Sequence, residues 1–239
     1  MTLSASHSII RISWVLFAGF SIALSARADR APDPSLENEA WAQAVVEIEV
    51  PITRRVDGYL RHFIERCSAT VVSPGPNPRL VSAWHCFEGY DELAAPAIAR
   101  TDTVTISLEL LASGGSMLED WAVLRGTDKW TPSAWMPISR TEAKAGKRIS
   151  AVGFARPPAN APTNFTERAV LIDPDCRVTH DESLPVASNC VVQQGASGGA
   201  IVGRTASGGM RVFGIISAGD SQSVSYFFPT ASLPLLLSP

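Results

Sequence analysis

The sequence contains no block of basic residues, and charged residues of either sign are few. They make up 18% of the 239 residues, and the net charge is −3 with the histidines neutral. Proteins that bind nucleic acid usually carry a concentrated positive patch that neutralises phosphates. Nucleic acid is therefore not an expected partner. Apolar residues make up 46% of the chain, which is enough to bury a core and excludes disorder by composition.

Long hydrophobic runs are also absent, apart from one near the amino terminus. Residues 12–24 (ISWVLFAGFSIAL) follow Arg11 and carry no charge, but they are short of the roughly 20 residues that span a bilayer. Residues 26–28 (ARA) then match a signal-peptidase site. We expect residues 1–28 to be a signal peptide cleaved after Ala28, which makes the protein secreted or periplasmic without a stable membrane anchor. An uncleaved anchor is the alternative. Residues 29–239 hold 18 basic and 23 acidic residues, a net charge of −5.

Common metal-binding motifs are missing as well, since the sequence has no Cys-x-x-Cys pair and no His-Glu-x-x-His. The chain has four cysteines, Cys67, Cys86, Cys176 and Cys190. An even number in an exported chain predicts two disulfides, for which three pairings are possible. Free or metal-bound thiols are the alternative. We expect no metal and no cofactor.

Helical periodicity is scarce, whereas short strand patterns are frequent. Residues 46–50 and 103–110 alternate apolar and polar side chains, and the second run places Val104, Ile106, Leu108 and Leu110 on one face. Gly- and Pro-rich turns at 73–78, 113–115 and 207–209 separate such runs, which predicts an antiparallel sandwich or barrel. Further β-rich runs lie at 70–72, 149–154, 169–172, 200–202, 212–216 and 224–228. Residues 29–40 read as a flexible leader to a domain at 41–239, with a break near 127–147 that could join two β halves.

Four local motifs carry the candidate chemistry. In the first, residues 67–73 (CSATVVS) lead through a loop to residues 80–86 (LVSAWHC). In the second, residues 119–124 (EDWAVL) place an acid before an apolar run. The third, residues 195–200 (GASGGA), places a serine in a glycine-rich turn, and the fourth, residues 214–219 (GIISAG), follows it. These motifs resemble, in order, those of trypsin-like serine proteases: Cys-x-Gly-x-Leu-Ile…Ala-Ala-His-Cys, Asp-Ile-Ala-Leu-Leu, Gly-Asp-Ser-Gly-Gly-Pro and Gly-Ile-Val-Ser-Trp-Gly. The resemblance covers roughly residues 41–230.

The resemblance implies an all-β fold of two packed six-stranded antiparallel barrels, the chymotrypsin-like fold, and a secreted serine endopeptidase acting on protein or peptide substrates. It assigns His85, Asp120 and Ser197 to a catalytic triad, the backbone N–H groups of Gly195 and Ser197 to the oxyanion hole, and Ser217 to a hydrogen bond with the triad aspartate. It also implies the pairs Cys67–Cys86 and Cys176–Cys190. The oligomeric state does not follow from the sequence.

The chemistry requires these residue types. A serine hydroxyl becomes a nucleophile when an imidazole takes its proton, and a carboxylate must then fix the imidazole tautomer. Residues 195–199 also match the Gly-x-Ser-x-Gly elbow of α/β-hydrolases, but that fold places its histidine after the serine, and every histidine here precedes Ser197. The subtilisin order of aspartate, histidine and serine would need Asp57 as the aspartate before His85, but no strand–turn–helix context supports that assignment. We interpret His62 and the His180–Asp181 pair as solvated. Because strand alternation lets only one of Glu119 and Asp120 face the site, one acid must be chosen, and the resemblance selects Asp120.

The resemblance also bears on specificity and activation. The substrate-binding positions are Val191 at the pocket base with Val192 next to it, and Ser217, Ala218 and Gly219 along the wall. No acid stands at the base, so we expect apolar or small residues before the scissile bond. Ala196 stands where many members of the family carry an aspartate that pairs with a newly freed amino terminus, so such activation is not expected. The alternative class is a catalytically silent, protease-like binding module.

Overall fold

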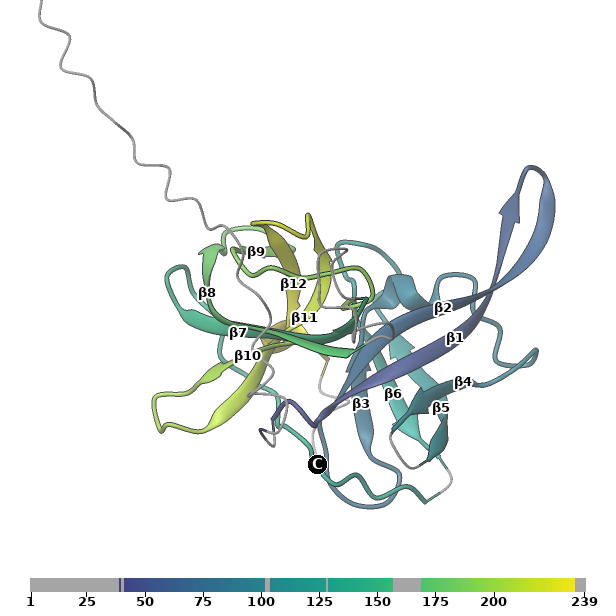
Figure 1. The fold of residues 1–239 in the computed structure, drawn as a ribbon, viewed down its shortest axis with the longest axis horizontal. Coiled ribbons are helices and arrows are strands. Elements are labelled where there is room, and N and C mark those ends of the chain that lie inside the picture. The colour runs from purple at the N-terminus through teal and green to yellow at the C-terminus, as the bar shows by residue number, and fades with distance from the viewer. Residues whose placement is uncertain (1–38, 40, 102–103, 128, 157–168, 235–239) are drawn as a thin grey trace, which may run out of the picture. The chain divides into compact units, whose positions relative to one another are not determined.

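The computed structural model describes residues 39, 41–101, 104–127, 129–156 and 169–234, and these residues are almost entirely β-structure. Twelve strands form two closed barrels of six antiparallel strands each, which confirms the expected fold (Figure 1). The first barrel contains β1 (Val45–Val56), β2 (Tyr59–Val71), β3 (Arg79–Ser82), β4 (Ala97–Arg100), β5 (Thr105–Ser113) and β6 (Ala122–Gly126). The second contains β7 (Arg148–Ala155), β8 (Ala169–His180), β9 (Val186–Ser188), β10 (Ala200–Arg204), β11 (Met210–Gly219) and β12 (Ser225–Pro229). The expected signal peptide and all but the end of the leader lie outside the described residues.

Alternating side chains explain how the strands close around a core. In β1, Ile48, Val50 and Ile52 are buried while Glu49 and Pro51 between them are partly exposed. In β5, Ile106 and Leu108 are each 2% exposed. Val104 was expected on the same face, but it precedes β5 and is 48% exposed, so the strand begins later than the pattern indicated.

The two barrels are joined by apolar contacts and by the linker between β6 and β7 (residues 127–147). In β11, Ile215 packs into the core of the first barrel and the adjacent Ile216 into that of the second, because successive strand residues point to opposite sides. The linker is hydrogen-bonded to both halves: the N–H of Met136 donates to the carbonyl of Val71 at 2.9 Å, and that of Ser139 to Val212 at 2.7 Å. These interactions fix where the loops of one barrel meet those of the other.

The four cysteines form two disulfides, Cys67–Cys86 and Cys176–Cys190, in the pairing that the resemblance implied. The first joins β2 to the short 3₁₀-helix η2 (Trp84–Phe87) of the first barrel. The second lies within the other barrel, where its cysteines are 14 residues apart, and closing such a loop stabilises the fold by about 3 kcal/mol in the chain-entropy model. Each bridge therefore cross-links one barrel to itself.

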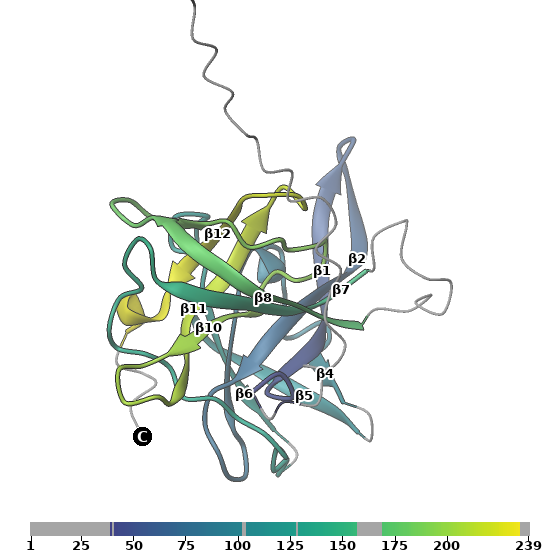
Figure 2. The same ribbon diagram turned by 60° about the vertical axis from the view of Figure 1, so that its left-hand side comes forward.

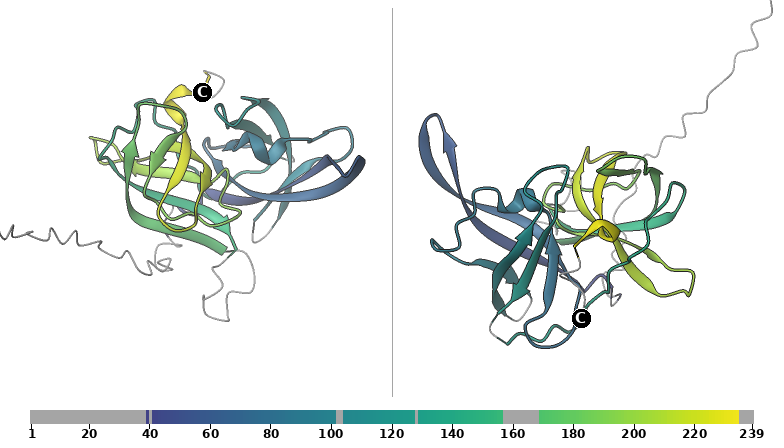
Figure 3. Two further views of the ribbon diagram at one scale, coloured as in Figure 1. Left: turned by 90° about the horizontal axis from the view of Figure 1, so that it is seen from above. Right: turned by 180° about the vertical axis from the view of Figure 1, so that it is seen from behind.

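Strands β1 and β2 extend beyond the first barrel as a hairpin arm (residues 51–66; Figures 1, 2 and 3). They pair from Val45 opposite Thr70 to Val56 opposite Tyr59. Asp57 and Gly58 form the tip with φ values of 52° and 84°, as expected for a tight hairpin turn, which suits Asp-Gly. Asp57 thus lies at the far end of the arm, which leaves no structural basis for the subtilisin order.

A second 3₁₀-helix, η3 (Thr230–Ser232), follows β12. Among the residues described here, no helix has the length and apolar character needed to cross a membrane.

Candidate active site

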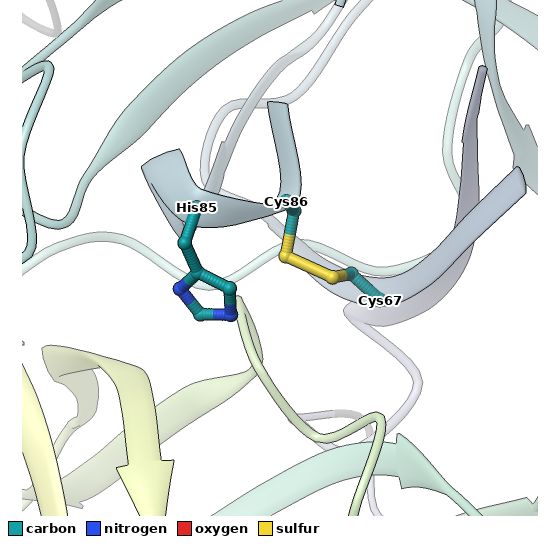
Figure 4. A group of neighbouring side chains, drawn as sticks. All are labelled: Cys67, His85 and Cys86. Atoms are coloured by element: carbon teal, nitrogen blue, oxygen red, sulfur yellow. A yellow bond between two sulfur atoms is a disulfide. The ribbon is translucent and has the colours of Figure 1, made fainter. Parts of the chain in front are cut away.

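His85 lies in η2, where the chain turns away from the end of β3, and Cys86 beside it is anchored by the disulfide to β2 (Figure 4). Two hydrogen bonds orient this residue. Its backbone N–H donates to Oδ1 of Asp120 at 2.9 Å, and its ring Nδ1 lies 2.8 Å from Oδ2 of the same carboxylate. The bond at Nδ1 leaves Nε2 as the ring nitrogen available for exchanging a proton with another group.

Asp120 is fully buried just before β6, and its carboxylate is held by donors from both barrels. Besides the two bonds from His85, the hydroxyl of Ser217 on β11 donates to Oδ2. Glu119, the neighbouring acid, is exposed. The structure therefore turns Asp120 inward and Glu119 outward, but the two residues lie in the turn before β6 and not in a strand, so the turn and not strand alternation separates them.

Ser197 lies in a turn before β10 that packs closely on the first barrel. We call residues 193–199 the serine loop. Gly198 has φ 82°, and a Cβ there would lie 2.1 Å from the carbonyl oxygen of Ser68 and 2.2 Å from Oγ of Ser82. A glycine is required at this position because both the backbone conformation and the available space exclude a side chain. The N–H of Ser68 also donates to the carbonyl of Ser197 at 2.8 Å.

His85 and Ser197 line the same cleft, of about 500 Å³, with residues of both barrels around it. In this conformation the Ser197 hydroxyl donates to the carbonyl of Ser217 at 3.5 Å rather than to His85. The structure thus brings His85, Asp120 and Ser197 to one place, with a complete His85–Asp120 pair and the hydroxyl turned toward β11. Gly195 lines the cleft beside them.

Four of the five expected substrate-binding residues line this cleft: Val192, Ser217, Ala218 and Gly219. Val191 is not among its lining residues; its backbone N–H donates to Oδ2 of the buried Asp173 at 2.8 Å. The side chain of Val192 fills the space next to Gly219, since a Cβ on that glycine would come within 2.3 Å of Val192 Cγ2. Val192 therefore limits the depth of the cleft at this point.

Charge is distributed unevenly around the cleft. Of its described lining residues, those of the second barrel carry no charge, whereas the first barrel contributes Arg54 and Glu88. Sequence reasoning missed both, because Arg54 comes from the hairpin arm and no local motif marks it. Asp220 follows the wall residues, but its carboxylate accepts hydrogen bonds from the N–H groups of residues 222–224, which hold its pKa well below the usual range. It is not a lining residue.

Three other groups of polar residues do not form sites. Cys67, His85 and Cys86 offer possible metal-ligand atoms within 4.8 Å of one another, but both sulfurs belong to the disulfide and provide no thiolate (Figure 4). His62 is exposed on the hairpin arm and bonded to Thr53. His180 is exposed, and the carboxylate of Asp181 lies 3.5 Å from Nζ of Lys144.

The sequence matches no protein-family model and no curated protein. The structure is similar to three solved proteases at low identity. The Rv3671c protease from M. tuberculosis, in its active form, is 18% identical with a TM-score of 0.56, over 84% of this chain and 83% of that one. The thermostable serine protease AL20 from an extremophilic microorganism is 18% identical with a TM-score of 0.56, over 80% and 92% of the two chains. The HtrA-type protease AlgW with a tripeptide is 18% identical with a TM-score of 0.52, over 79% of this chain and 57% of that one. The chain therefore has the trypsin/chymotrypsin-like serine protease fold.

Proposed function

We propose that this protein is a secreted serine endopeptidase that hydrolyses peptide bonds through His85, Asp120 and Ser197. One observation carries the proposal: the buried Asp120 carboxylate holds the backbone and ring of His85 in a cleft that also contains Ser197. That arrangement suits general-base activation of a serine hydroxyl, because the carboxylate fixes the imidazole tautomer and stabilises the imidazolium. The fold shared with solved serine proteases supports it.

The proposed reaction begins when Ser197 Oγ rotates from Ser217 toward His85, a change that substrate-free sites often require. Oγ attacks the substrate carbonyl carbon and its proton passes to His85 Nε2. The tetrahedral intermediate then collapses, the C–N bond breaks, and His85 returns the proton to the leaving amine. Water repeats the sequence on the acyl-enzyme, releasing the acid and restoring Ser197. Asp120 stabilises the imidazolium formed in each half-reaction.

The oxyanion formed on the substrate would be held by the N–H groups of Gly195 and Ser197. The carbonyl of Gln194 accepts a hydrogen bond from the N–H of Arg156 at 3.2 Å. Because the C=O and N–H of a trans peptide point in opposite directions, the N–H of Gly195 faces away from Arg156. Among the residues that the structure describes, no acceptor is bonded to the N–H of Ser197.

A serine-directed fluorophosphonate tests the proposal, because it reacts only with an activated serine. We expect one label per chain, on Ser197, together with hydrolysis of a casein substrate. A folded protein that is neither labelled nor hydrolytic would instead be a silent binding module of the same fold. Export to the periplasm or the medium is part of the proposal, and the two disulfides are consistent with an oxidising compartment.

We expect cleavage after small or apolar residues, because the second-barrel lining is uncharged and Val192 fills the space beside Gly219. An unpaired lysine or glutamate buried there would cost several kcal/mol, roughly 2–7 by transfer measurements on polar groups and more for a charge. Cleavage products from a peptide library reveal the preference. Val192→Ala should move it toward larger apolar residues by deepening the cleft. Dominant cleavage after Arg, Lys or Glu in the wild type would overturn the assignment.

We also expect activity to be insensitive to where the chain begins between residues 29 and 38. Ala196 is buried and cannot pair with an ammonium group, and its Cβ would lie 2.8 Å from one added at Gly153, so the space around it is filled. Forms beginning at several of these positions, or carrying an added amino-terminal tag, can be compared on one ester substrate. Activity in a single form only, with the others folded and inactive, would demonstrate activation by a defined terminus.

A further inference from the structure

The serine loop (residues 193–199) must present two N–H groups in a fixed direction if the proposed function is correct, yet residue 196 offers no charge to anchor it. The first barrel supplies another anchor, Ser68 on β2, which is completely buried. Its position in the sequence, directly after Cys67, gave no indication of this role.

Ser68 contacts the second barrel through both its side chain and its backbone. The N–H of Phe154 on β7 donates to Ser68 Oγ at 2.8 Å. The hydroxyl proton of Ser68 has the carbonyl oxygen of Gly195 as its nearest acceptor, at 3.1 Å, with that of Phe154 at 3.3 Å. The backbone N–H of Ser68 donates to the carbonyl of Ser197 at 2.8 Å. One residue of the first barrel thus holds the two carbonyls on either side of Ala196.

The bonds from Ser68 complete the restraint of four consecutive carbonyls. Gln194 is bonded to the N–H of Arg156 and Ala196 to that of Gly199 at 2.9 Å, while Gly195 and Ser197 are bonded to Ser68. Because each carbonyl sets the direction of the N–H in its own peptide, the four bonds together determine the orientation of the loop. Gly195 has φ 99°, and a glycine can rotate through conformations that other residues avoid. Its carbonyl belongs to the peptide that lies between the two oxyanion N–H groups, and the N–H of that peptide, on Ala196, donates to the carbonyl of Gln193 at 3.0 Å. Ser68 therefore restrains the oxyanion groups through this central peptide rather than through their own peptides.

We propose that Ser68 is a positioning residue whose hydroxyl locks the serine loop in the orientation that the oxyanion site requires. It does so through a neutral hydrogen bond across the barrel interface, where Ala196 excludes an ion pair. The proposal rests on the proposed function for its catalytic consequence, but the restraint itself is a property of the loop. Ser68 does not touch the reacting atoms.

Ser68→Ala removes one oxygen atom and leaves the disulfide and the backbone bond to Ser197 in place. We expect kcat to fall by up to about 100-fold with little change in KM, because a misdirected oxyanion N–H approaches the effect of losing that donor, which costs about 10²–10³ in kcat. A peptide aldehyde, which forms a tetrahedral adduct with Ser197 Oγ, should lose affinity by a similar factor. The corresponding peptide alcohol forms no adduct and should bind as before. Ser68→Thr retains the hydroxyl and should restore most of the activity.

Thr230→Val is the matched control. Thr230 is equally buried, and its hydroxyl donates to the carbonyls of Ser139 and Val212, at 2.9 and 2.8 Å, outside the cleft. The Thr230→Val variant should lower Tm about as much as Ser68→Ala does, without the loss of kcat. Hydrogen exchange at the amides of residues 193–199 gives a readout independent of activity, and it should accelerate in Ser68→Ala but not in Thr230→Val.

These measurements separate two failures. A wild-type protein without activity, combined with faster exchange in Ser68→Ala, would remove the proposed function and leave the loop restraint established. An active wild type, with kcat and exchange unchanged in Ser68→Ala, would overturn the role of Ser68. Equal losses of kcat in folded Ser68→Ala and Ser68→Thr variants would also overturn it. If the alanine variant does not fold, a loss of kcat in Ser68→Thr as large as the one expected for alanine overturns it.

Discussion

Replacing Ser197 with alanine is expected to abolish fluorophosphonate labelling and to lower kcat by about 10⁶-fold, the effect of removing a triad serine. The loss follows because no other oxygen takes the place of the nucleophile. The fold should persist, since the Ser197 hydroxyl makes only a 3.5 Å contact with the carbonyl of Ser217, and the bond from Ser68 goes to the backbone. Label incorporation measured by mass spectrometry, with turnover on an ester substrate, provides the test.

The chain contains its own control for this substitution. Ser207 also precedes two glycines and lies in an exposed turn between β10 and β11, but it does not line the cleft. Ser207→Ala should retain both labelling and turnover. Labelling that survives in Ser197→Ala, or that disappears in Ser207→Ala, contradicts the assignment of the nucleophile.

Replacing Asp120 with asparagine should reduce kcat by about 10⁴-fold without unfolding the protein. Oδ2 faces two donors, Nδ1 of His85 and the hydroxyl of Ser217, while Oδ1 faces the backbone N–H of His85. If the amide nitrogen takes the Oδ2 position, His85 must carry its proton on Nε2 and cannot accept one from Ser197. If it takes the Oδ1 position, two N–H donors face each other. Either arrangement removes the base or its support.

Glu119→Gln is the matched control, because it removes the adjacent carboxylate from an exposed side chain. Its turnover should equal that of the wild type, whereas Asp120→Asn should lose activity while it remains folded. The comparison is made on one substrate at one pH. Wild-type turnover in Asp120→Asn would show that Asp120 is not the catalytic carboxylate. A larger loss in Glu119→Gln than in Asp120→Asn would show the same.

Strands with clear alternation or with a run of β-rich residues could be predicted from the sequence, whereas those that depend on the partner strand could not. The runs at 46–50, 149–154 and 212–216 lie in β1, β7 and β11. The short strands β3, β4 and β9 were not predicted, because three or four residues give too little pattern. The hairpin arm was also missed: residues 59–64 are all exposed, so β2 there shows no alternation between buried and polar faces.

The candidate site divides in the same way. The positions of His85, Asp120 and Ser197 could be proposed because each lies in a local motif, and chain order relates the motifs. The cleft around them depends on contacts between distant segments. The side chain of Arg54 reaches it from the hairpin arm, and Val191, expected at the pocket base, is not among its lining residues. Ser68 was visible in its motif, but its role depends on Phe154 and Gly195, which only the folded barrels bring near.

The placement of the disulfides has a consequence for the order of folding. Each bridge closes on its own barrel, so no covalent bond other than the main chain joins the two halves. Each disulfide can therefore form within its own half, whereas Ile215 of β11 completes the core of the first barrel only when the halves pack together. The His85–Asp120 pair forms within the first unit, but the hydroxyl of Ser217 and the serine loop belong to the second. If the proposed function is correct, the nucleophile meets its base only when the two halves pack together, so activity is the last property that the folding chain acquires.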